Sequence, residues 1–388
     1  MSLSKNGINQ SAQDLIRSKL KQHCHIEING NQPQDIHVHN DKFYSMVMNE
    51  SDLGLAESYM LGYWTTRNLY LTLYNLLAGQ SKLQSIMNYN VQDGLTYVKN
   101  YFINQQNIEK AELNVHQHYD IGNDLYVRML DKNLQYTCAF FQDTDNLNIA
   151  QEQKMKLIGQ KLNLKRGQTV LDIGSGWGGL VNYLAQTYQV KVLGITLSKE
   201  QIKYARHRYG KNKYASYEYM DYRKIPKNMK FDRIVSVGML EHVGSKNFDE
   251  YFKVVHDHLH KNGIALIHTI GTYKNKGLNG KFIQKYIFPG GYIPSFQELS
   301  NVVPSYFQIH DWHNFGKYYA KTLKGWYKNI NSKWHEIPHY NQQFRNMWNF
   351  YLLGCAAVFE LCDLQLWQLL LSKDCIDLPK RDCLIKRE

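Results

Sequence analysis

The segment from Val170 to Gly179 constrains the fold of this chain more than any other. Its first residues are apolar around one acid, Asp172, and four glycines then follow within six residues before helical sequence begins. This pattern predicts a buried parallel strand, a tight turn in backbone conformations that glycine tolerates, and the start of a helix. Because such a turn lets the backbone approach a nucleotide-like ligand, we expect a cofactor site at the carboxyl end of a parallel sheet.

The glycines alone do not identify that cofactor. Gly174, Gly176 and Gly179 fit the dinucleotide pattern G-x-G-x-x-G, which is a weak signal, and a turn without any ligand is the simplest alternative. Asp172 would repel a pyrophosphate but not a cationic ligand, and the next predicted strand, Val190–Ile195, lacks a following acid to hold the ribose of NAD. The pattern D-x-G-x-G-x-G is typical of methyltransferases. The sequence therefore favours S-adenosylmethionine, which carries positive charge, over the cofactor of an NAD-dependent dehydrogenase.

Composition indicates a globular protein with a basic surface. The chain has 388 residues, of which 43% are hydrophobic and 13% aromatic, and its formal net charge is +12. The positive charge favours a polyanionic partner. Because no basic helix with the spacing of a nucleic-acid motif is found, we expect anionic phospholipid headgroups and no nucleic acid; a merely solvated basic surface is the alternative.

The cysteines and the apolar runs bear on the compartment. No apolar run reaches the roughly 18 residues of a membrane span, and no apolar signal region follows the first residues. The six cysteines form no C-x-x-C pair, so we expect reduced thiols, no disulfide framework and no metal site. These features predict a cytoplasmic protein that binds the inner face of the membrane peripherally.

The chain divides into two predicted domains. Residues 1–112 form a mainly helical N-terminal domain and linker, with an apolar unit at Leu53–Leu77, and residues 113–388 alternate strands and helices. In the second part, strands are expected at 190–195, 214–219, 231–237, 263–269 and 364–371, and helices at 179–188, 199–209, 248–260 and 350–362. This alternation predicts an α/β fold with a doubly wound, Rossmann-like parallel sheet. A loop over 281–294 interrupts it and is interpreted as a cover over the substrate.

Several other segments carry more chemistry-bearing residues than folding alone requires. They are His118–Asp124, Gln135–Ala139, Gly238–Gly244, Leu266–Gly271 and Asp311–Gly316, together with Glu57–Met60 and Leu364–Gln368. With these segments the chain closely resembles the cyclopropane-fatty-acyl-phospholipid synthases, which use S-adenosylmethionine to cyclopropanate unsaturated acyl chains of membrane lipids. The resemblance runs over essentially the whole chain.

The resemblance implies a catalytic site with a bound anion. In this family the alkene attacks the sulfonium methyl group, a carbocation forms, and a base removes a proton from the transferred methyl before the ring closes. The base is a bicarbonate ion, and the matched motifs place it at Cys138, Glu241, His268, the backbone of Ile270, and Tyr319. Cys138 would line the anion site, and Glu241 with His268 would form an acid–imidazole pair that orients the anion.

Each of these side chains also has a purely structural interpretation. Cys138 alone would be a small buried hydrophobe, Glu241 a solvated loop acid, His268 a core histidine, and Tyr319 a packing aromatic. His242, which follows Glu241, is interpreted as structural.

The resemblance also implies the contacts of the cofactor. The glycine turn should hold its methionine part, Tyr136 and Thr137 its carboxylate, the end of the second strand its ribose, and the end of the third strand its adenine. The residues are Tyr136, Thr137, Asp172, Gly174, Ser175, Gly176, Gly178, Thr196, Leu197, Ser198, Gln201, Asp221, Tyr222 and Arg223. Ser175 stands where the family commonly has cysteine, which should matter little because backbone geometry dominates at the turn. Leu61 and Tyr63 also depart from the family's first-domain pattern.

The main interpretation is an enzyme that cyclopropanates phospholipid acyl chains as a homodimer docked on the membrane. Leu53–Leu77 and Phe282–Phe288 would insert into the interface, unless they form a helical core and a lid. A related lipid methyltransferase with a methyl-branched or methylene product is the close alternative, since the lifetime of the cation decides the product. A non-catalytic lipid-binding protein should have lost Glu241, His268 or Cys138, and all three are present.

Overall fold

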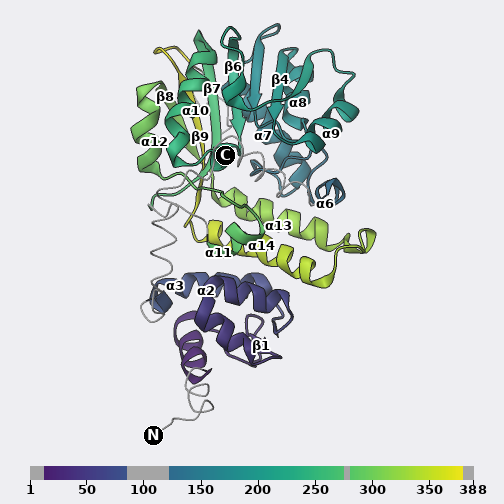
Figure 1. Ribbon diagram of the computed structural model, residues 1–388, viewed down its shortest axis with the longest axis vertical. Helices are drawn as coiled ribbons and strands as arrows, with labels where there is room; N and C mark the ends of the chain where they lie inside the picture. Colours follow the sequence, from purple (N-terminus) through teal and green to yellow (C-terminus); the bar gives the residue numbers. More distant parts are fainter. Residues whose placement is uncertain (1–12, 85–121, 275–279, 379–388) are drawn as a thin grey trace. The chain divides into compact units, whose positions relative to one another are not determined.

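The chain forms two compact units, and the computed structural model describes residues 13–84, 122–274 and 280–378 of it (Figure 1). The first unit takes its described residues from 13–84, 280–287 and 323–363. The second takes them from 122–274, 288–322 and 364–378. Each unit therefore draws on segments that are distant in sequence.

This division differs from the two continuous domains, 1–112 and 113–388, that the sequence suggested. The expected boundary and the polar linker lie outside the described residues. Residues 280–287 and 323–363, which we had assigned to the second domain, belong to the first unit. The reason is packing: helix α14 (Gln342–Glu360) lies against helices α2 (Lys42–Met60) and α3 (Leu69–Gln84).

The first unit is mainly helical, as expected. Besides α2, α3 and α14 it contains the π-helical turn η1 (Leu20–Cys24), the ribbon of β1 (His37–Val38) and β2 (Trp64–Thr65), η6 (Trp334–Glu336), and α11 (Lys281–Tyr286). The first part of the segment 281–294, which was predicted to be a loop, forms helix α11. Glu57 of α2 anchors it, because its Oε1 accepts hydrogen bonds from Lys285 Nζ at 2.6 Å and Tyr286 OH at 2.7 Å.

The apolar side chains proposed to enter the membrane are mostly buried inside this first unit. Leu69, Leu73 and Phe282 are 9%, 3% and 5% exposed, whereas Leu61 is 47% exposed. These segments therefore form a helical core in this conformation. No helix in the described part of the chain is both long and apolar enough to cross a bilayer.

The second unit is built on a sheet that has seven strands in the described residues. They are β3 (Thr169–Ile173), β4 (Lys191–Thr196), β5 (Ala215–Tyr219), β6 (Phe231–Val237), β7 (Leu259–Gly271), β8 (Gln308–Asn314) and β9 (Gln365–Ser372). Their order is β5-β4-β3-β6-β7-β9-β8, and β9 runs antiparallel to the other six. The expected strand bounds hold to within one residue, except that β7 begins four residues before the predicted 263 and ends two residues after the predicted 269; β8 was not predicted.

Helices cover both faces of this sheet (Figure 1). One buried core joins β3 and β4 to α7 (Leu147–Lys161), α8 (Gly179–Tyr188) and α9 (Lys199–Tyr209), and a second joins β6 and β7 to α10 (Phe248–His258) and α12 (Phe296–Val302). The remaining elements are α6 (Asn123–Met129), η2 (Tyr222–Lys224), η3 (Leu240–His242), η4 (Ser245–Asn247) and η5 (Val303–Ser305). Helix α13 (Lys317–Asn331) begins in this unit and continues into the first from residue 323 on. The doubly wound α/β fold predicted from the sequence is confirmed.

The last glycine of the turn, Gly179, is required by packing. A Cβ at this first residue of α8 would lie 1.9 Å from the backbone oxygen of Asn133 and 2.9 Å from Nε2 of Gln135. The helix therefore starts in direct contact with the loop that leads to residues 136–138.

Replacing Gly179 with alanine should push α8 away from this loop. We expect Gly179→Ala to lower the free energy of unfolding by about 1–3 kcal/mol, the usual cost of overpacking. Urea denaturation measures it. Gly354→Ala is the control, because its Cβ would meet only Leu73 Cδ1, at 3.8 Å, and alanine favours the helix by up to about 1 kcal/mol. Equal stabilities of the two variants would contradict the packing argument.

Candidate functional site

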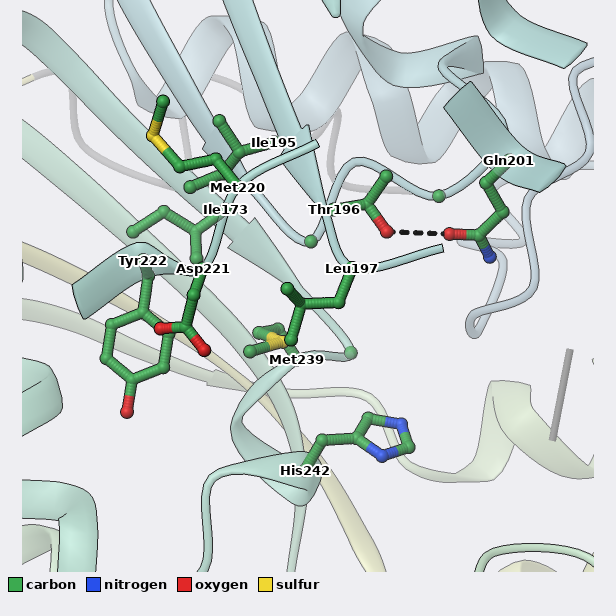
Figure 2. Close-up of a pocket in the computed structure, with 13 residues that line it drawn as sticks. Ile173, Ile195, Thr196, Leu197, Gln201, Met220, Asp221, Tyr222, Met239 and His242 are labelled. Carbon is green, nitrogen blue, oxygen red and sulfur yellow. Dashed lines mark hydrogen bonds between the residues drawn. The ribbon is translucent and has the colours of Figure 1, made fainter. Parts of the chain in front are cut away.

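A pocket lies where β3, β4, β5 and β6 end, at the carboxyl edge of the sheet (Figure 2). Ligands of open α/β sheets bind at this edge. Its lining residues come from the last residues of these strands and from the segments that follow them: Ile173, Gly174, Gly176, Ile195, Thr196, Leu197, Gln201, Met220, Asp221, Tyr222, Gly238, Met239 and His242.

The glycine turn forms one wall of the pocket. The backbone φ angles of Gly174, Gly176 and Gly178 are 86°, 54° and 83°, and residues other than glycine rarely adopt such values. The backbone N–H groups of Gly174 and Ser175 both donate to the oxygen of Ile195 at 2.9 Å, so the turn is tied to β4. A Cβ on Gly176 would meet nothing within 4 Å. That open space is where a ligand can approach the backbone.

The second wall follows β4. Thr196 Oγ1 donates to Gln201 Oε1 at 2.8 Å, which fixes both polar side chains at the rim (Figure 2). Ser198 does not line the pocket; its hydroxyl accepts from the N–H of Gln201 at 3.2 Å and caps α9. Of the expected ribose residues, Thr196, Leu197 and Gln201 therefore face the pocket, and Ser198 holds the helix that carries Gln201.

The third wall follows β5, where Asp221 is held by Arg223. Asp221 Oδ1 accepts from the Arg223 N–H at 2.9 Å and from its Nε at 2.8 Å, and Oδ2 accepts from Nη2 at 2.7 Å. Both side chains are buried. Asp221 and Tyr222 line the pocket, while Arg223 lies behind Asp221 and positions it.

Seven of the predicted cofactor residues line this pocket: Gly174, Gly176, Thr196, Leu197, Gln201, Asp221 and Tyr222. The other seven do not: Tyr136, Thr137, Asp172, Ser175, Gly178, Ser198 and Arg223. Thr137 is nevertheless adjacent, because its Cγ2 would lie 2.6 Å from a Cβ at Gly238, a lining residue.

Sequence reasoning missed six lining residues, namely Ile173, Ile195, Met220, Gly238, Met239 and His242. Met220 directly follows β5, and Gly238 and Met239 directly follow β6. Their place after a strand was a signal, but apolar residues there carry no chemical motif. Burial lowers the pKa of His242 to about 4, so its imidazole is neutral at this wall.

Glu241 lies one residue beyond Leu240 in η3. Its Oε1 accepts a 2.6 Å hydrogen bond from the backbone N–H of Ile270, and its Oε2 is buried without a hydrogen-bond partner. Burial raises the pKa of Glu241 to about 7, although the Ile270 N–H opposes this shift. The solvated-acid interpretation of Glu241 therefore does not fit the structure.

His268 lies in β7 and is 1% exposed. Its Nδ1 is 3.2 Å from Nε2 of Gln368, and its own Nε2 is buried without a partner. Burial and the positive charges of Lys154 and Lys161 hold the pKa of His268 well below its usual value. Glu241 and His268 thus bond to different groups of the chain, and their action as a pair that orients an anion stays a prediction.

Cys138 and Tyr319 are the other two side chains expected at the anion site. Cys138 is fully buried, its Sγ lies 3.3 Å from the oxygen of Ala139, and burial raises the pKa of its thiol. A neutral thiol is no nucleophile. Thr322 of α13 donates to Cys138 Sγ at 3.9 Å, which brings the helix that carries Tyr319, itself 9% exposed, against this loop.

A buried lysine stands behind the site. Lys154 of α7 is fully buried, and its Nζ donates to Thr137 Oγ1 at 2.7 Å. Burial lowers its pKa to about 8, opposed by the charges of Asp131 and Asp172. Asp172 is itself 1% exposed, its Oδ1 has no partner, and burial raises its pKa to about 7.

Comparison with known proteins identifies the family of this chain. Residues 106–369 match the family of mycolic acid cyclopropane synthetases. The chain is also 43% identical over 359 residues to the cyclopropane-fatty-acyl-phospholipid synthase of Escherichia coli (strain K12), covering 92% of this chain and 93% of that protein. The chain belongs to the cyclopropane synthase family. It is an S-adenosylmethionine-dependent methyltransferase, as the sequence predicted.

Solved structures of cyclopropane synthases share its fold. The cyclopropane synthase MmaA2 from Mycobacterium tuberculosis aligns with a TM-score of 0.64 and 29% identity, over 68% of this chain and 98% of that one. The mycolic acid cyclopropane synthase CmaA1, complexed with SAH and CTAB, aligns with a TM-score of 0.63 and 30% identity over the same shares.

A side chain at Gly176 should block the cofactor in this synthase. We expect Gly176→Ala to abolish measurable binding of S-adenosylmethionine in calorimetry, because its Cβ enters the open space at the turn. Gly167→Ala is the matched control, since Gly167 also has a positive φ, 87°, and open space around it, but does not line the pocket. Both should lose about 1–2 kcal/mol of stability to backbone strain. Equal affinities in the two variants would refute the assignment.

The raised pKa of Glu241 gives a pH test of its burial. Between the unfolded value of 4.5 and about 7, the folded protein holds a proton on Glu241 that the unfolded chain releases, so wild-type stability falls as pH rises. Glu241→Gln cannot ionise, so its stability should not fall with pH for this reason. We expect it to equal the wild type near pH 4.5 and to exceed it by on the order of 2–3 kcal/mol at pH 8 in urea denaturation. A stability difference that does not change with pH would contradict the shift.

Proposed function

We propose that this synthase transfers a methylene group from S-adenosylmethionine to the double bond of unsaturated phospholipid acyl chains, with bicarbonate as the base. The similarity to the Escherichia coli enzyme over 92% of the chain supports the substrate class. The observation that carries the proposal for the base is a pair of buried, unpartnered polar atoms, Glu241 Oε2 and His268 Nε2.

The pocket suits S-adenosylmethionine. When bound, this cofactor supplies an electrophilic methyl group on a positively charged sulfur. The turn at Gly174 and Gly176 offers open backbone for its methionine part, and Asp221 offers a fixed carboxylate at the far wall. Met220 and Met239 supply apolar surface between them. The buried Asp172 lies beneath the turn, where a positive ligand favours its ionised form.

The residues beside the pocket suit an anion. A Glu241 carboxyl with a pKa of about 7 is partly protonated at neutral pH, so its Oε2 can donate to an anionic oxygen. His268 Nε2 and the buried Lys154 add a polar group and a positive charge. Bicarbonate supplies the basic oxygen that removes the methyl proton. The thiol of Cys138 is neutral and therefore does not act as a nucleophile. The reaction needs none from the protein, because the alkene itself attacks the methyl group.

The environment also suits a carbocation. The ring of Phe315 lies 5.8 Å from that of His268 and 5.4 Å from that of Phe140, and the ring of Tyr318 lies 5.5 Å from that of Phe140. Aromatic faces stabilise positive charge and exclude water. This favours ring closure over capture of the cation by water.

Lipid mass spectrometry of cells with and without the protein tests the product. We expect unsaturated acyl chains to gain the mass of one CH₂ group and to lose their double bond, which ozonolysis reports. A methylene product would keep a double bond, and a methyl-branched chain would lack the ring protons in NMR; either result would overturn cyclopropanation. Purified enzyme should lose activity in bicarbonate-depleted buffer and regain it when bicarbonate returns. Activity that does not depend on bicarbonate would remove the proposed base.

We also propose that the enzyme is cytoplasmic and docks as a homodimer on the anionic inner face of the membrane. Helix α9 and the turn after it carry exposed cationic residues: Lys199, Lys203, Arg206, Arg208, Lys211 and Lys213. Each such residue near an anionic surface contributes about 1 kcal/mol. A dimer would present two such faces, so the second contact would be intramolecular.

Vesicle binding tests the electrostatic docking. We expect co-sedimentation with phosphatidylglycerol vesicles to weaken steeply as salt rises, because the charges are exposed and screened. Lys203→Glu with Arg206→Glu should weaken binding further, while Lys165→Glu with Arg166→Glu, two exposed residues before β3, is the charge-matched control. Equal binding to neutral and anionic vesicles at every salt concentration would refute this proposal.

A further inference from the structure

Gln368, in the segment Leu364–Gln368 that the sequence analysis singled out, lies beside the site at the centre of the sheet. It is fully buried in β9, and the strand pairing places it directly opposite His268 of β7 on one side and His313 of β8 on the other. Three polar residues thus stand in one row across neighbouring strands. A buried amide in such a row needs an explanation beyond packing.

The contact between Gln368 and His268 determines where the imidazole carries its proton. The amide nitrogen of Gln368 can only donate, so His268 Nδ1, 3.2 Å away, must accept with its lone pair. A neutral imidazole has a single N–H, which must then lie on Nε2. That Nε2 is buried and has no hydrogen-bond partner among the residues that the structure describes.

We propose that Gln368 is a positioning residue that fixes His268 in the Nε2–H tautomer, so that this N–H is offered to an oxygen of the bound bicarbonate. This inference rests on the proposed function for the identity of the anion. Gln368 does not touch the anion; it acts through the imidazole.

Burial keeps His268 in the neutral state that a tautomer requires, and the charged groups around it act in the same direction. Lys154 and Lys161 approach from α7, and His313 from β8. Lys161 is 1% exposed, and its Nζ lies 2.9 Å from Asp311 Oδ2 and 3.1 Å from His313 Nδ1. Two buried ammonium groups beside His268 oppose the addition of a third positive charge.

The orientation of one amide therefore decides whether the site attracts an anion. If the oxygen of Gln368 faced Nδ1, the imidazole proton would move to Nδ1, and the lone pair of Nε2 would face the anionic oxygen. Lone pairs facing each other in a buried site repel. With the amide nitrogen of Gln368 facing Nδ1, Nε2 of the same imidazole carries the proton and can donate, while the ring stays neutral.

Nitrogen-15 NMR of the histidines in the full-length enzyme tests the tautomer directly. We expect His268, assigned by loss of its signals in His268→Gln, to show the shifts of an Nε2–H imidazole. In Gln368→Glu the carboxylate accepts from Nδ1–H, so the signals should change to the Nδ1–H tautomer, which leaves Nε2 without a proton. The KM for bicarbonate should rise about tenfold, the loss of one hydrogen bond to a charged group, while the affinity for S-adenosylmethionine is unchanged.

Two further variants keep the test decisive. Gln365→Glu, on the same strand, adds the same charge but keeps an oxygen for Asn314 Nδ2, which donates to Gln365 at 2.8 Å. It should leave the tautomer and the KM for bicarbonate unchanged. Gln368→Met preserves the volume of the side chain but has no donor, so it should give a mixture of the two tautomers. It replaces Gln368→Glu in the test if that variant does not fold.

The outcomes separate this inference from the proposed function. An Nδ1–H tautomer in the wild type, or a tautomer that neither Gln368 variant alters, would overturn the role of Gln368. An Nε2–H tautomer that depends on Gln368, in an enzyme whose activity does not respond to bicarbonate, would overturn bicarbonate as the anion while the tautomer assignment stands.

Discussion

The backbone oxygen of Ile195 accepts hydrogen bonds from both Gly174 and Ser175 at 2.9 Å, and the cofactor pocket depends on this contact. It ties the turn after β3 to the end of β4, so that two walls of the pocket are held together. The left-handed glycines then expose backbone to the ligand, and Gly179 lets α8 start against Asn133. A local arrangement of glycines thus positions elements from three parts of the chain.

The site contains buried polar groups that destabilise the folded protein. Glu241, His268 and Asp172 each hold a buried polar atom without a partner, which costs free energy in the ligand-free protein. The neighbouring strands and helices are apolar and closely packed, and they over-determine the positions of these groups. The free energy of folding that these groups cost is lost at the place where the proposed reaction needs polar groups ready to bind a cation and an anion.

Local sequence patterns predicted the second unit well. Helices 179–188 and 199–209 and strand 231–237 end where expected, because caps, turns and apolar runs act over a few residues. The discontinuous first unit was not predictable in this way, since α14 joins it through contacts distant in sequence. At the site, motif matching identified Glu241 and Asp221 but not Met220 or Met239, whose apolar side chains carry no chemical signature. It also treated Ser198 and Arg223 as ligand contacts, whereas their bonds hold Gln201 and Asp221.

Charge balance links these features. Lys154 places a positive charge beneath the loop of Thr137 and Cys138, and the sulfonium of the cofactor would add one more, which methyl transfer would pass on to the carbocation. Positive charges confined to an apolar site repel one another strongly. The lowered pKa of Lys154, about 8, reflects this burial before any ligand is added. Asp172 and Asp131 offset part of this excess, and the proposed anion would offset more. An anionic base therefore suits this site better than a neutral one, since it removes the proton and also compensates the charge of the cation that it deprotonates.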